Sequence, residues 1–133
     1  MNKNKNFFVL TSHKPNEDQE TEIIERFKAN IIFLSDELQN LWSNVEPDSE
    51  FEISWASPFF NYLKKKSSAK DIVWIQGEPG ISHILTLFCY KNDLIPVYST
   101  TKRFFKSEIQ ENGTSKNIHY FKHVNFRKYP VLK

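Results

Sequence analysis

The residues best suited to chemistry in this sequence stand in three polar segments, each of which directly follows a run of apolar residues. The segments are Ser12-His13, Gln76-Gly77-Glu78-Pro79-Gly80 and Ser99-Thr100-Thr101-Lys102-Arg103. In open α/β sheets, ligands bind beyond the carboxyl ends of the strands. If the apolar runs are strands of one sheet, the three segments meet at one edge and form a polar binding site. The alternative is that strand ends simply turn polar where they reach the surface.

The third segment is suited to an anionic ligand such as a phosphate group. It offers the hydroxyl groups of Ser99, Thr100 and Thr101 and the cations of Lys102 and Arg103. Hydroxyl groups donate hydrogen bonds to phosphate oxygens, and an Arg guanidinium donates two parallel hydrogen bonds to one phosphate. The alternative is a solvated loop whose hydroxyl groups cap the element that follows.

The glycine-bearing turn from Gln76 to Gly80 opens a predicted helix, so its backbone N–H groups can face an anion. It has neither the spacing of a dinucleotide-binding motif nor that of a P-loop. Glu78 would repel a phosphate if its side chain pointed inward. A plain tight turn is therefore the alternative interpretation of this segment.

Two groups of histidines are candidates for chemistry. His13 follows the first predicted strand and is, by position, the best placed for proton transfer; a structural hydrogen bond is the alternative. His119 and His123 are four residues apart, a spacing that on a helix can begin a zinc site. Their neighbours favour a β-strand and no third ligand is evident, so we predict no metal site. No combination of nucleophile, base and acid is evident either. On a terminal hairpin, four polar side chains can instead reach over an anionic ligand: Lys122, His123, Asn125 and Arg127.

The elements that must position these residues alternate between strand and helix. Four short apolar runs predict buried strands: Phe7–Thr11, Ile31–Leu34, Asp71–Gln76 and Ile95–Tyr98. Apolar residues at helical spacing predict helices between the strands. The expected helix starts are Asn16 with a capping box to Gln19, Ser35 or Asp36, Ser57-Pro58 and the Gly77–Gly80 turn.

The C-terminal third has a different pattern. The dipeptide Asn112-Gly113 predicts the turn of a hairpin between Ser107–Glu111 and Ile118–Phe126. The whole order predicts a single α/β domain over residues 1–133. We expect a Rossmann-like open sheet, mainly parallel, with a C-terminal β-hairpin at its edge.

Composition restricts the class of protein further. The chain has 133 residues, 39% hydrophobic and 26% charged, which is typical of a globular domain. No stretch reaches the roughly 20 apolar residues of a membrane helix, and Phe7–Leu10 is too short for the core of a signal peptide. Cys89 is the single cysteine, which excludes an intrachain disulfide and a cysteine metal cluster. We therefore expect a cytoplasmic location and no membrane partner.

Charge is unevenly distributed along the chain. Residues 15–52 hold eleven acidic and two basic residues, whereas residues 100–133 hold eight basic and two acidic residues. A basic C-terminal third indicates an anionic partner nearby. The alternative is that the two segments offset one another across the surface.

Five segments stand in an order shared with a known family. They are Ser12-His13, Leu41-Trp42-Ser43-Asn44, Trp74-Ile75-Gln76-Gly77 with Gly80, Pro96 to Arg103, and Phe121 to Tyr129. The chain thereby resembles small stand-alone accessory proteins of type III CRISPR systems, the Csx-series family numbered twenty, over the span Phe8–Tyr129. One departure is Glu78-Pro79, where the family pattern has an aspartate and an aromatic residue. This departure puts the role of an acid at the turn in doubt.

The resemblance implies a CARF-like domain, a Rossmann variant that binds cyclic oligoadenylate. It implies a ring nuclease that linearises this messenger, with cyclic tetra-adenylate as the expected ring, and so switches off type III CRISPR signalling. A ribose 2′-hydroxyl would attack the neighbouring phosphorus in line, without a metal or other cofactor. A homodimer is expected, because its two-fold symmetry suits a symmetric ring, and DNA is not an expected partner.

The resemblance also assigns roles to the candidate residues. Lys102 and Arg103 would bind phosphates and stabilise the transition state, and His13 or His123 would assist proton transfer. Gly77 would permit close approach of the backbone to the ligand. The expected ligand-binding residues are Ser12, Gln76, Gly77, Gly80, Ser99, Thr100, Thr101, Asn125 and Arg127.

Three alternatives to the nuclease stay open. The same pocket can bind the messenger without cutting it, as a sensor or sponge. The basic hairpin can make the chain a general RNA-binding protein, with a steep dependence of affinity on salt. The fold can also serve an unrelated small ligand.

Overall fold

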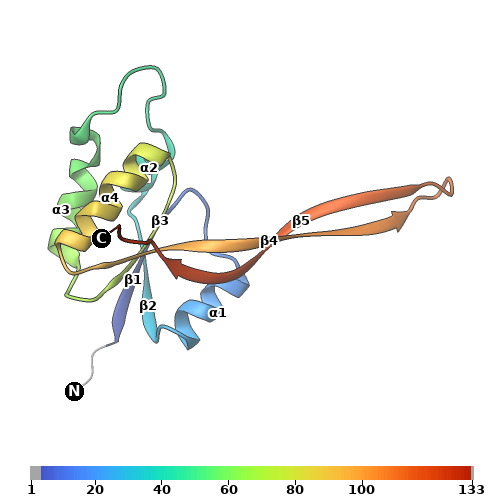
Figure 1. The fold of residues 1–133 in the computed structure, drawn as a ribbon, viewed down its shortest axis with the longest axis horizontal. Helices are drawn as coiled ribbons and strands as arrows, with labels where there is room; N and C mark the ends of the chain where they lie inside the picture. The colour runs from blue at the N-terminus through green and yellow to red at the C-terminus, as the bar shows by residue number, and fades with distance from the viewer. Residues whose placement is uncertain (1–3, 133) are drawn as a thin grey trace.

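A five-stranded sheet with helices on both faces forms the body of the protein (Figure 1). The computed structural model describes residues 4–132. The strands are β1 (Lys5–Thr11), β2 (Ala29–Phe33), β3 (Ile72–Gln76), β4 (Ile95–Ile109) and β5 (Ser115–Lys128). Their spatial order is β2-β1-β3-β4-β5, and all neighbours are parallel except β4 and β5. The predicted Rossmann-like α/β fold, mainly parallel with a C-terminal hairpin, is confirmed.

The helices divide between the two faces of the sheet. They are α1 (Glu17–Glu25), α2 (Asp36–Ser43), α3 (Ser57–Lys66), α4 (Pro79–Lys91) and a short 3₁₀-helix η1 (Ile53–Ala56). Helix α1 packs on one face through Ile23, and the others pack on the opposite face. The predicted capping box is present, because Asn16 accepts a hydrogen bond from the Gln19 backbone N–H while the Gln19 side chain accepts one from the Asn16 N–H. Ser35 likewise caps α2.

The central strands are apolar at consecutive positions because both of their faces are covered. In β1, Phe8 and Leu10 pack toward α2, α3 and α4, whereas Phe7 and Val9 pack toward α1. Strand β2 differs from the prediction of a fully buried strand. It lies at the edge of the sheet, so Phe33 is 53% exposed. No helix among the described residues is long and apolar enough to cross a membrane.

Strand β4 is longer than predicted, and this changes the setting of the third polar segment. The apolar run ends at Tyr98, but the strand continues to Ile109. Only Ile95–Val97 pair with β3; beyond them, β4 keeps its ladder with β5 alone. The Ser99–Arg103 segment is therefore part of a strand and not a loop after one. Both strands are mostly exposed beyond Thr100, so this part of the ladder carries no burial pattern and the hydrophobic pattern did not reveal it.

The paired strands project from the body as a long two-stranded ribbon (Figure 1). We call residues 102–122 the arm. Its turn includes Gly113 with a φ of 84°, a left-handed conformation that glycine adopts without strain. The predicted Asn112-Gly113 turn is thus confirmed, within a hairpin that extends further on both sides than the sequence indicated.

Candidate functional site

A cleft of about 340 Å³ lies where β1 and β3 end and α1 begins. We call it the strand-end cleft. It is lined by Thr11, Ser12, His13, Lys14, Gln19, Trp74, Gln76, Gly77, Ser99 and Thr101. Residues of all three polar segments therefore meet at the carboxyl edge of the sheet, as their positions after apolar runs predicted.

Other predicted ligand-binding residues lie outside this lining. Lys102 and Arg103 are exposed at the base of the arm, and the Lys102 ammonium group lies 5.6 Å from the centre of the Phe104 ring. The Arg127 guanidinium lies 6.0 Å from the centre of the Tyr98 ring. Within one chain these cations do not line the cleft, and their phosphate-binding role stays a prediction.

Thr100 and Asn125 contact one another across the ladder between β4 and β5. The Thr100 hydroxyl donates a hydrogen bond to the Asn125 side-chain oxygen over 2.7 Å. Thr101, the next residue along β4, does line the cleft. The alternation of side chains along a strand thus separates two neighbouring threonines that the sequence had placed together.

The helix N-terminus after β3 is already occupied by an acid of its own chain. The Glu78 carboxylate accepts hydrogen bonds from the backbone N–H groups of Gly80 (2.8 Å) and Ile81 (3.0 Å). These are the donors that a phosphate would need. The anion cradle considered for this turn is therefore filled, and the tight-turn alternative describes it.

Glycine at position 77 is required by packing. A Cβ added to Gly77 would lie 2.7 Å from the Trp42 ring. Trp42 of α2 therefore approaches this backbone closely, and this packing by itself requires a glycine. The predicted approach of a ligand at Gly77 is a separate role and stays a prediction. Asn44 ends α2, and its side chain donates a hydrogen bond to the Asn40 carbonyl.

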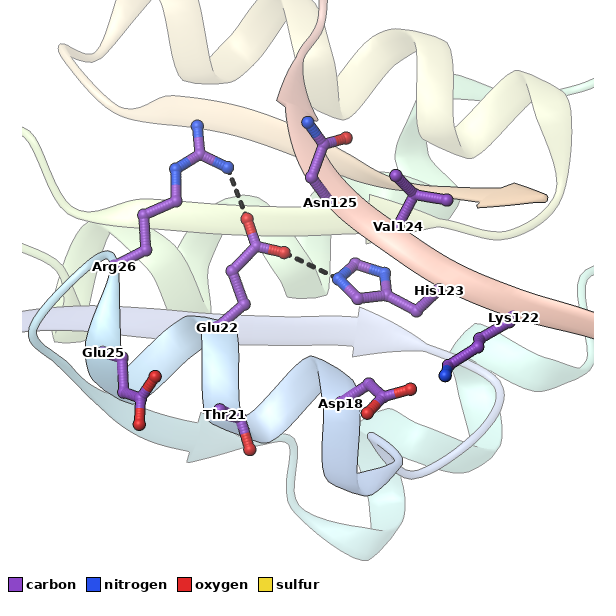
Figure 2. Close-up of a pocket in the computed structure, with 9 residues that line it drawn as sticks. All are labelled: Asp18, Thr21, Glu22, Glu25, Arg26, Lys122, His123, Val124 and Asn125. Atoms are coloured by element: carbon purple, nitrogen blue, oxygen red, sulfur yellow. Dashed lines mark hydrogen bonds and ion pairs between the residues drawn. The ribbon is translucent and has the colours of Figure 1, made fainter.

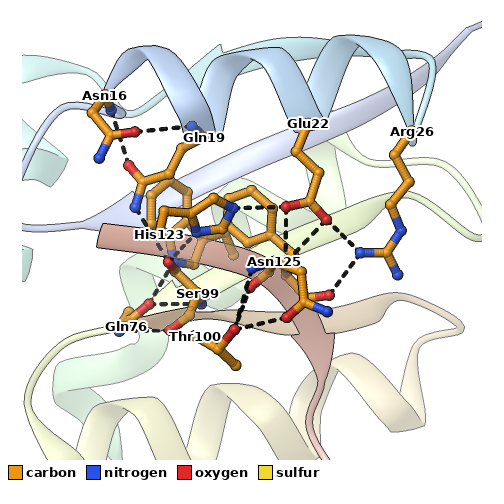
Figure 3. Close-up of polar contacts among 11 residues, drawn as sticks. Asn16, Gln19, Glu22, Arg26, Gln76, Ser99, Thr100, His123 and Asn125 are labelled. Atoms are coloured by element: carbon orange, nitrogen blue, oxygen red, sulfur yellow. Dashed lines mark hydrogen bonds and ion pairs between the residues drawn. The ribbon is translucent and has the colours of Figure 1, made fainter. Parts of the chain in front are cut away.

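A buried chain of hydrogen bonds joins the cleft to α1 (Figure 3). The Ser99 hydroxyl lies 2.6 Å from Nδ1 of His123, and Nε2 of His123 lies 2.7 Å from the Glu22 carboxylate. The side chains of His123 and Glu22 are only 3% and 13% exposed. Serine, histidine and glutamate are in contact here, from segments up to 101 residues apart. The order of residues along the sequence did not reveal this combination.

The charge of Glu22 sets the direction of these hydrogen bonds. Burial raises the pKa of Glu22, but hydrogen bonds from the Phe126 N–H, His123 and Arg26 outweigh it and hold the pKa below its ordinary value. Glu22 is therefore ionised at neutral pH and can only accept. In a neutral imidazole, Nε2 of His123 then carries the proton, and Nδ1 accepts a hydrogen bond from the Ser99 hydroxyl.

Two glutamines hold Ser99 in place (Figure 3). The Gln19 side chain donates to the Ser99 hydroxyl oxygen over 3.3 Å. The Gln76 side-chain oxygen accepts from the Ser99 backbone N–H (2.9 Å) and from the Trp74 ring N–H (2.8 Å). The Ser99 hydroxyl thus has one donor and one acceptor partner, which together fix its orientation.

A second pocket of about 640 Å³ lies on the other side of His123 (Figure 2). We call it the outer pocket. It is lined by Asp18, Thr21, Glu22, Glu25, Arg26, Lys122, His123, Val124 and Asn125. Because Ser99 lines the cleft and His123 lines the outer pocket, the Ser99–His123 pair stands between the two.

A β-bulge places His123 in this position. Thr100 pairs with Asn125 and Thr101 pairs with His123, so Val124 is an extra residue in β5. In a regular strand, His123 and Phe126 would face opposite sides of the sheet. The bulge turns both toward α1, with their ring centres 4.7 Å apart.

Comparison with known proteins gives a family. The chain matches the model of the "Uncharacterized protein MJ1673 family" over residues 5–127. It is 40% identical over 123 residues to "Uncharacterized protein MJ1673" of Methanocaldococcus jannaschii, which covers 92% of this chain and 95% of that relative. The chain belongs to the MJ1673 family. No solved structure matches it.

The MJ1673 family match includes the residues that build the cleft and the buried hydrogen-bond chain, from β1 to Arg127 of β5. Neither comparison bears on a link to CRISPR systems or on cyclic oligoadenylate. Those expectations stay predictions.

Proposed function

We propose that this protein binds cyclic oligoadenylate at the strand-end cleft and linearises it, and that cyclic tetra-adenylate is its ring. The convergence of three polar strand ends on one cleft carries the proposal, because this edge of an open α/β sheet is where ligands bind. The sequence resemblance to type III CRISPR accessory proteins supplies the chemical class of the ligand. The protein then acts in the cytoplasm to end type III CRISPR signalling.

The chemistry of the cleft fits part of such a ligand. Lys14 brings a cation, and Ser12, His13, Gln19 and Thr101 bring hydrogen-bonding groups. A volume of about 340 Å³ is near the lower end for small-molecule sites, which is about 300 Å³. A ring of several nucleotides is larger than this, so one chain holds only a part of it.

The partner that completes the site is a second copy of the chain, related by a two-fold axis. An isolated two-stranded hairpin is only marginally stable in water, so the arm needs a surface to cover it. Phe105, Ile109 and Phe121 on the arm are 67%, 84% and 70% exposed. The arm carries five basic and two acidic residues, and α1 begins with Glu17, Asp18 and Glu20. This charge complementarity favours an arm that packs on the acidic side of another copy.

Cleavage then follows from positioning and charge stabilisation. A ribose 2′-oxygen attacks the adjacent phosphorus, the bond from phosphorus to the 5′-oxygen breaks, and a linear product with a 2′,3′-cyclic phosphate remains. Lys102 and Arg103 at the base of the arm stabilise the charge on the phosphate, in the site completed by the second copy. The reaction uses groups of the ligand and the protein and requires no cofactor.

The experiment incubates the protein with excess cyclic tetra-adenylate in EDTA and resolves the products by mass. Linear di- or tetra-adenylate with a cyclic phosphate, formed over many turnovers, is the expected result. Intact ligand that stays bound would identify a sponge or sensor instead. If the protein neither binds nor cleaves rings with three to six members, the proposal is refuted.

The exposed aromatic and basic residues of the arm favour one further candidate, a general RNA-binding function. Phe104 and Tyr120 stack across the arm with ring centres 5.5 Å apart, beside Lys102 and Lys106. Aromatic rings and cations are the groups that hold single-stranded RNA. This candidate predicts tight binding of linear RNA that weakens steeply with salt. Binding of the ring without binding of linear oligoadenylate would exclude it.

A further inference from the structure

We infer that Ser99, His123 and Glu22 form a proton relay that serves the strand-end cleft, with the Ser99 hydroxyl as its entrance. The nature of the substrate, a ribose 2′-hydroxyl beside a phosphodiester, rests on the proposed function. The geometry of the relay does not, and the first experiment below tests it without a ligand.

The relay has one end at the strand-end cleft and the other at the outer pocket. Ser99 lines the cleft, and its hydroxyl contacts Nδ1 of His123 over 2.6 Å. Behind it, Nε2 of His123 contacts the Glu22 carboxylate over 2.7 Å. Both distances are those of short hydrogen bonds, and burial of the imidazole strengthens them by lowering the local dielectric.

The anchoring of Glu22 gives the relay its direction. Both carboxylate oxygens of Glu22 accept from the Phe126 backbone N–H at 3.1 Å, and Arg26 pairs with the same carboxylate. This keeps a negative charge at the Nε2 side of His123. A proton that arrives at Nδ1 therefore produces an imidazolium whose charge Glu22 stabilises, which is the role of the acid in hydrolase triads.

The arrangement exceeds what a structural clamp would need. Glu22 and Arg26 already hold β5 against α1 without the histidine, because Glu22 accepts from the Phe126 N–H and Arg26 donates to the Phe126 carbonyl over 2.9 Å. In addition, Gln19 donates to the Ser99 hydroxyl oxygen, which leaves its O–H directed at Nδ1. The orientation of a single hydroxyl at the cleft wall is the feature that a clamp does not explain.

The proton balance of the step is closed. The 2′-hydroxyl gives its proton to the Ser99 oxygen while the Ser99 proton moves to Nδ1 of His123. The 2′-oxygen attacks phosphorus, the bond to the 5′-oxygen breaks, and the departing oxygen takes a proton from water. The imidazolium returns its proton through Ser99 to the hydroxide that this leaves, which restores the water, so the transesterification consumes no net proton. General-base assistance of this kind contributes about 10²- to 10⁴-fold in rate.

The first experiment reads the tautomer of His123 by ¹⁵N NMR of histidine-labelled protein at neutral pH. The relay requires a ring whose proton lies on Nε2 and whose Nδ1 accepts the Ser99 hydrogen bond. We expect Glu22→Gln to perturb this signal and Glu25→Gln to leave it unchanged, because Glu25 lines the same outer pocket from the same helix. A ring with its proton on Nδ1, or a doubly protonated ring, would overturn the relay, since it could not accept a proton from Ser99.

The second experiment measures turnover of cyclic tetra-adenylate. Ser99→Ala and Glu22→Gln should each lower kcat at least 100-fold with little change in KM, while Ser99→Thr, which keeps the hydroxyl, should retain part of the activity. A Ser99→Ala variant with wild-type kcat would refute the relay. If the wild type does not cleave the ring but the tautomer is as expected, the proposed function fails and the relay geometry stands.

Discussion

Glu22 contributes to the stability of the fold and also belongs to the proposed relay. Its carboxylate accepts the Phe126 N–H, contacts His123 and pairs with Arg26, and so joins α1 to the edge of the sheet. A glutamine of the same size keeps one acceptor but loses the charge. Charged hydrogen-bond acceptors that are partly buried are costly to remove, by about 1–3 kcal/mol.

We therefore expect Glu22→Gln to lower the free energy of unfolding by about 1–3 kcal/mol at pH 7. The pKa of Glu22 is lowered in the folded state, so its contribution is present above the ordinary carboxyl pKa and is lost as pH falls through the folded value. The difference between wild type and variant should thus shrink on acidification. Denaturant unfolding at pH 7 and at about pH 3 checks this, with Glu25→Gln as control. A difference that does not change with pH would contradict it.

The sequence could indicate some site residues but not others, for a physical reason. Ser12, Gln76 and Ser99 follow apolar runs, so their place at the carboxyl edge follows from local pattern. Nothing local distinguishes Glu22 from the other acids of α1. Its contact with His123 depends on the bulge at Val124, which no residue type near it signals.

At the scale of elements, the packing of α2 against the turn after β3 explains Gly77. The Trp42 ring occupies the place of a Cβ at this position, and the same ring is held edge-on by Phe59 at 5.3 Å. Trp42 is fully buried, so it has no room to move away. Insertion of one methyl group into such a site forces neighbouring groups out of place.

Gly77→Ala should therefore destabilise the protein by about 1–3 kcal/mol. Gly80→Ala is the comparison: its Cβ would lie 2.9 Å from the ring of Phe51 and 3.1 Å from the Glu78 carboxylate. Phe51 is a partly buried loop residue that can shift, and alanine favours the helix by about 1 kcal/mol, so we expect a smaller loss than at Gly77. Thermal and denaturant unfolding compare the two variants. Equal stability of both with the wild type would show that Gly77 is not held by packing.

Helix starts and turns could be predicted from the sequence where neighbouring residues determine them, whereas the end of a strand that depends on a distant partner strand could not. The capping box at Asn16 and the turn at Gly113 are set by residues within a few positions, and both are present as predicted. The extension of β4 past Tyr98 depends on pairing with β5, which carries no burial pattern because both strands are exposed there. Hydrophobic periodicity reports burial, so it ended the strand where burial ends.

At the scale of the whole molecule, the arm projects from the body and is not covered by it (Figure 1). Its exposed residues include Phe105 and Phe121, which lie two pairs apart on the β4–β5 ladder and therefore on the same face. Large apolar groups exposed together on one surface mark an interaction site. A second copy that covers this face with its acidic side would also bring a second strand-end cleft into the assembly, as a symmetric ring requires.

We therefore expect a dimer in sedimentation experiments at micromolar concentration, weakened at high salt because opposite charges take part in the contact. The double substitution Phe105→Ser with Phe121→Ser should give a folded monomer, since both side chains are mostly exposed and the body does not depend on them. Ile53→Ser, at an exposed apolar residue of the body, is the control and should stay dimeric. A wild type that is monomeric would remove the second copy from the proposal. A dimer that survives the double substitution would place the contact elsewhere than on the arm.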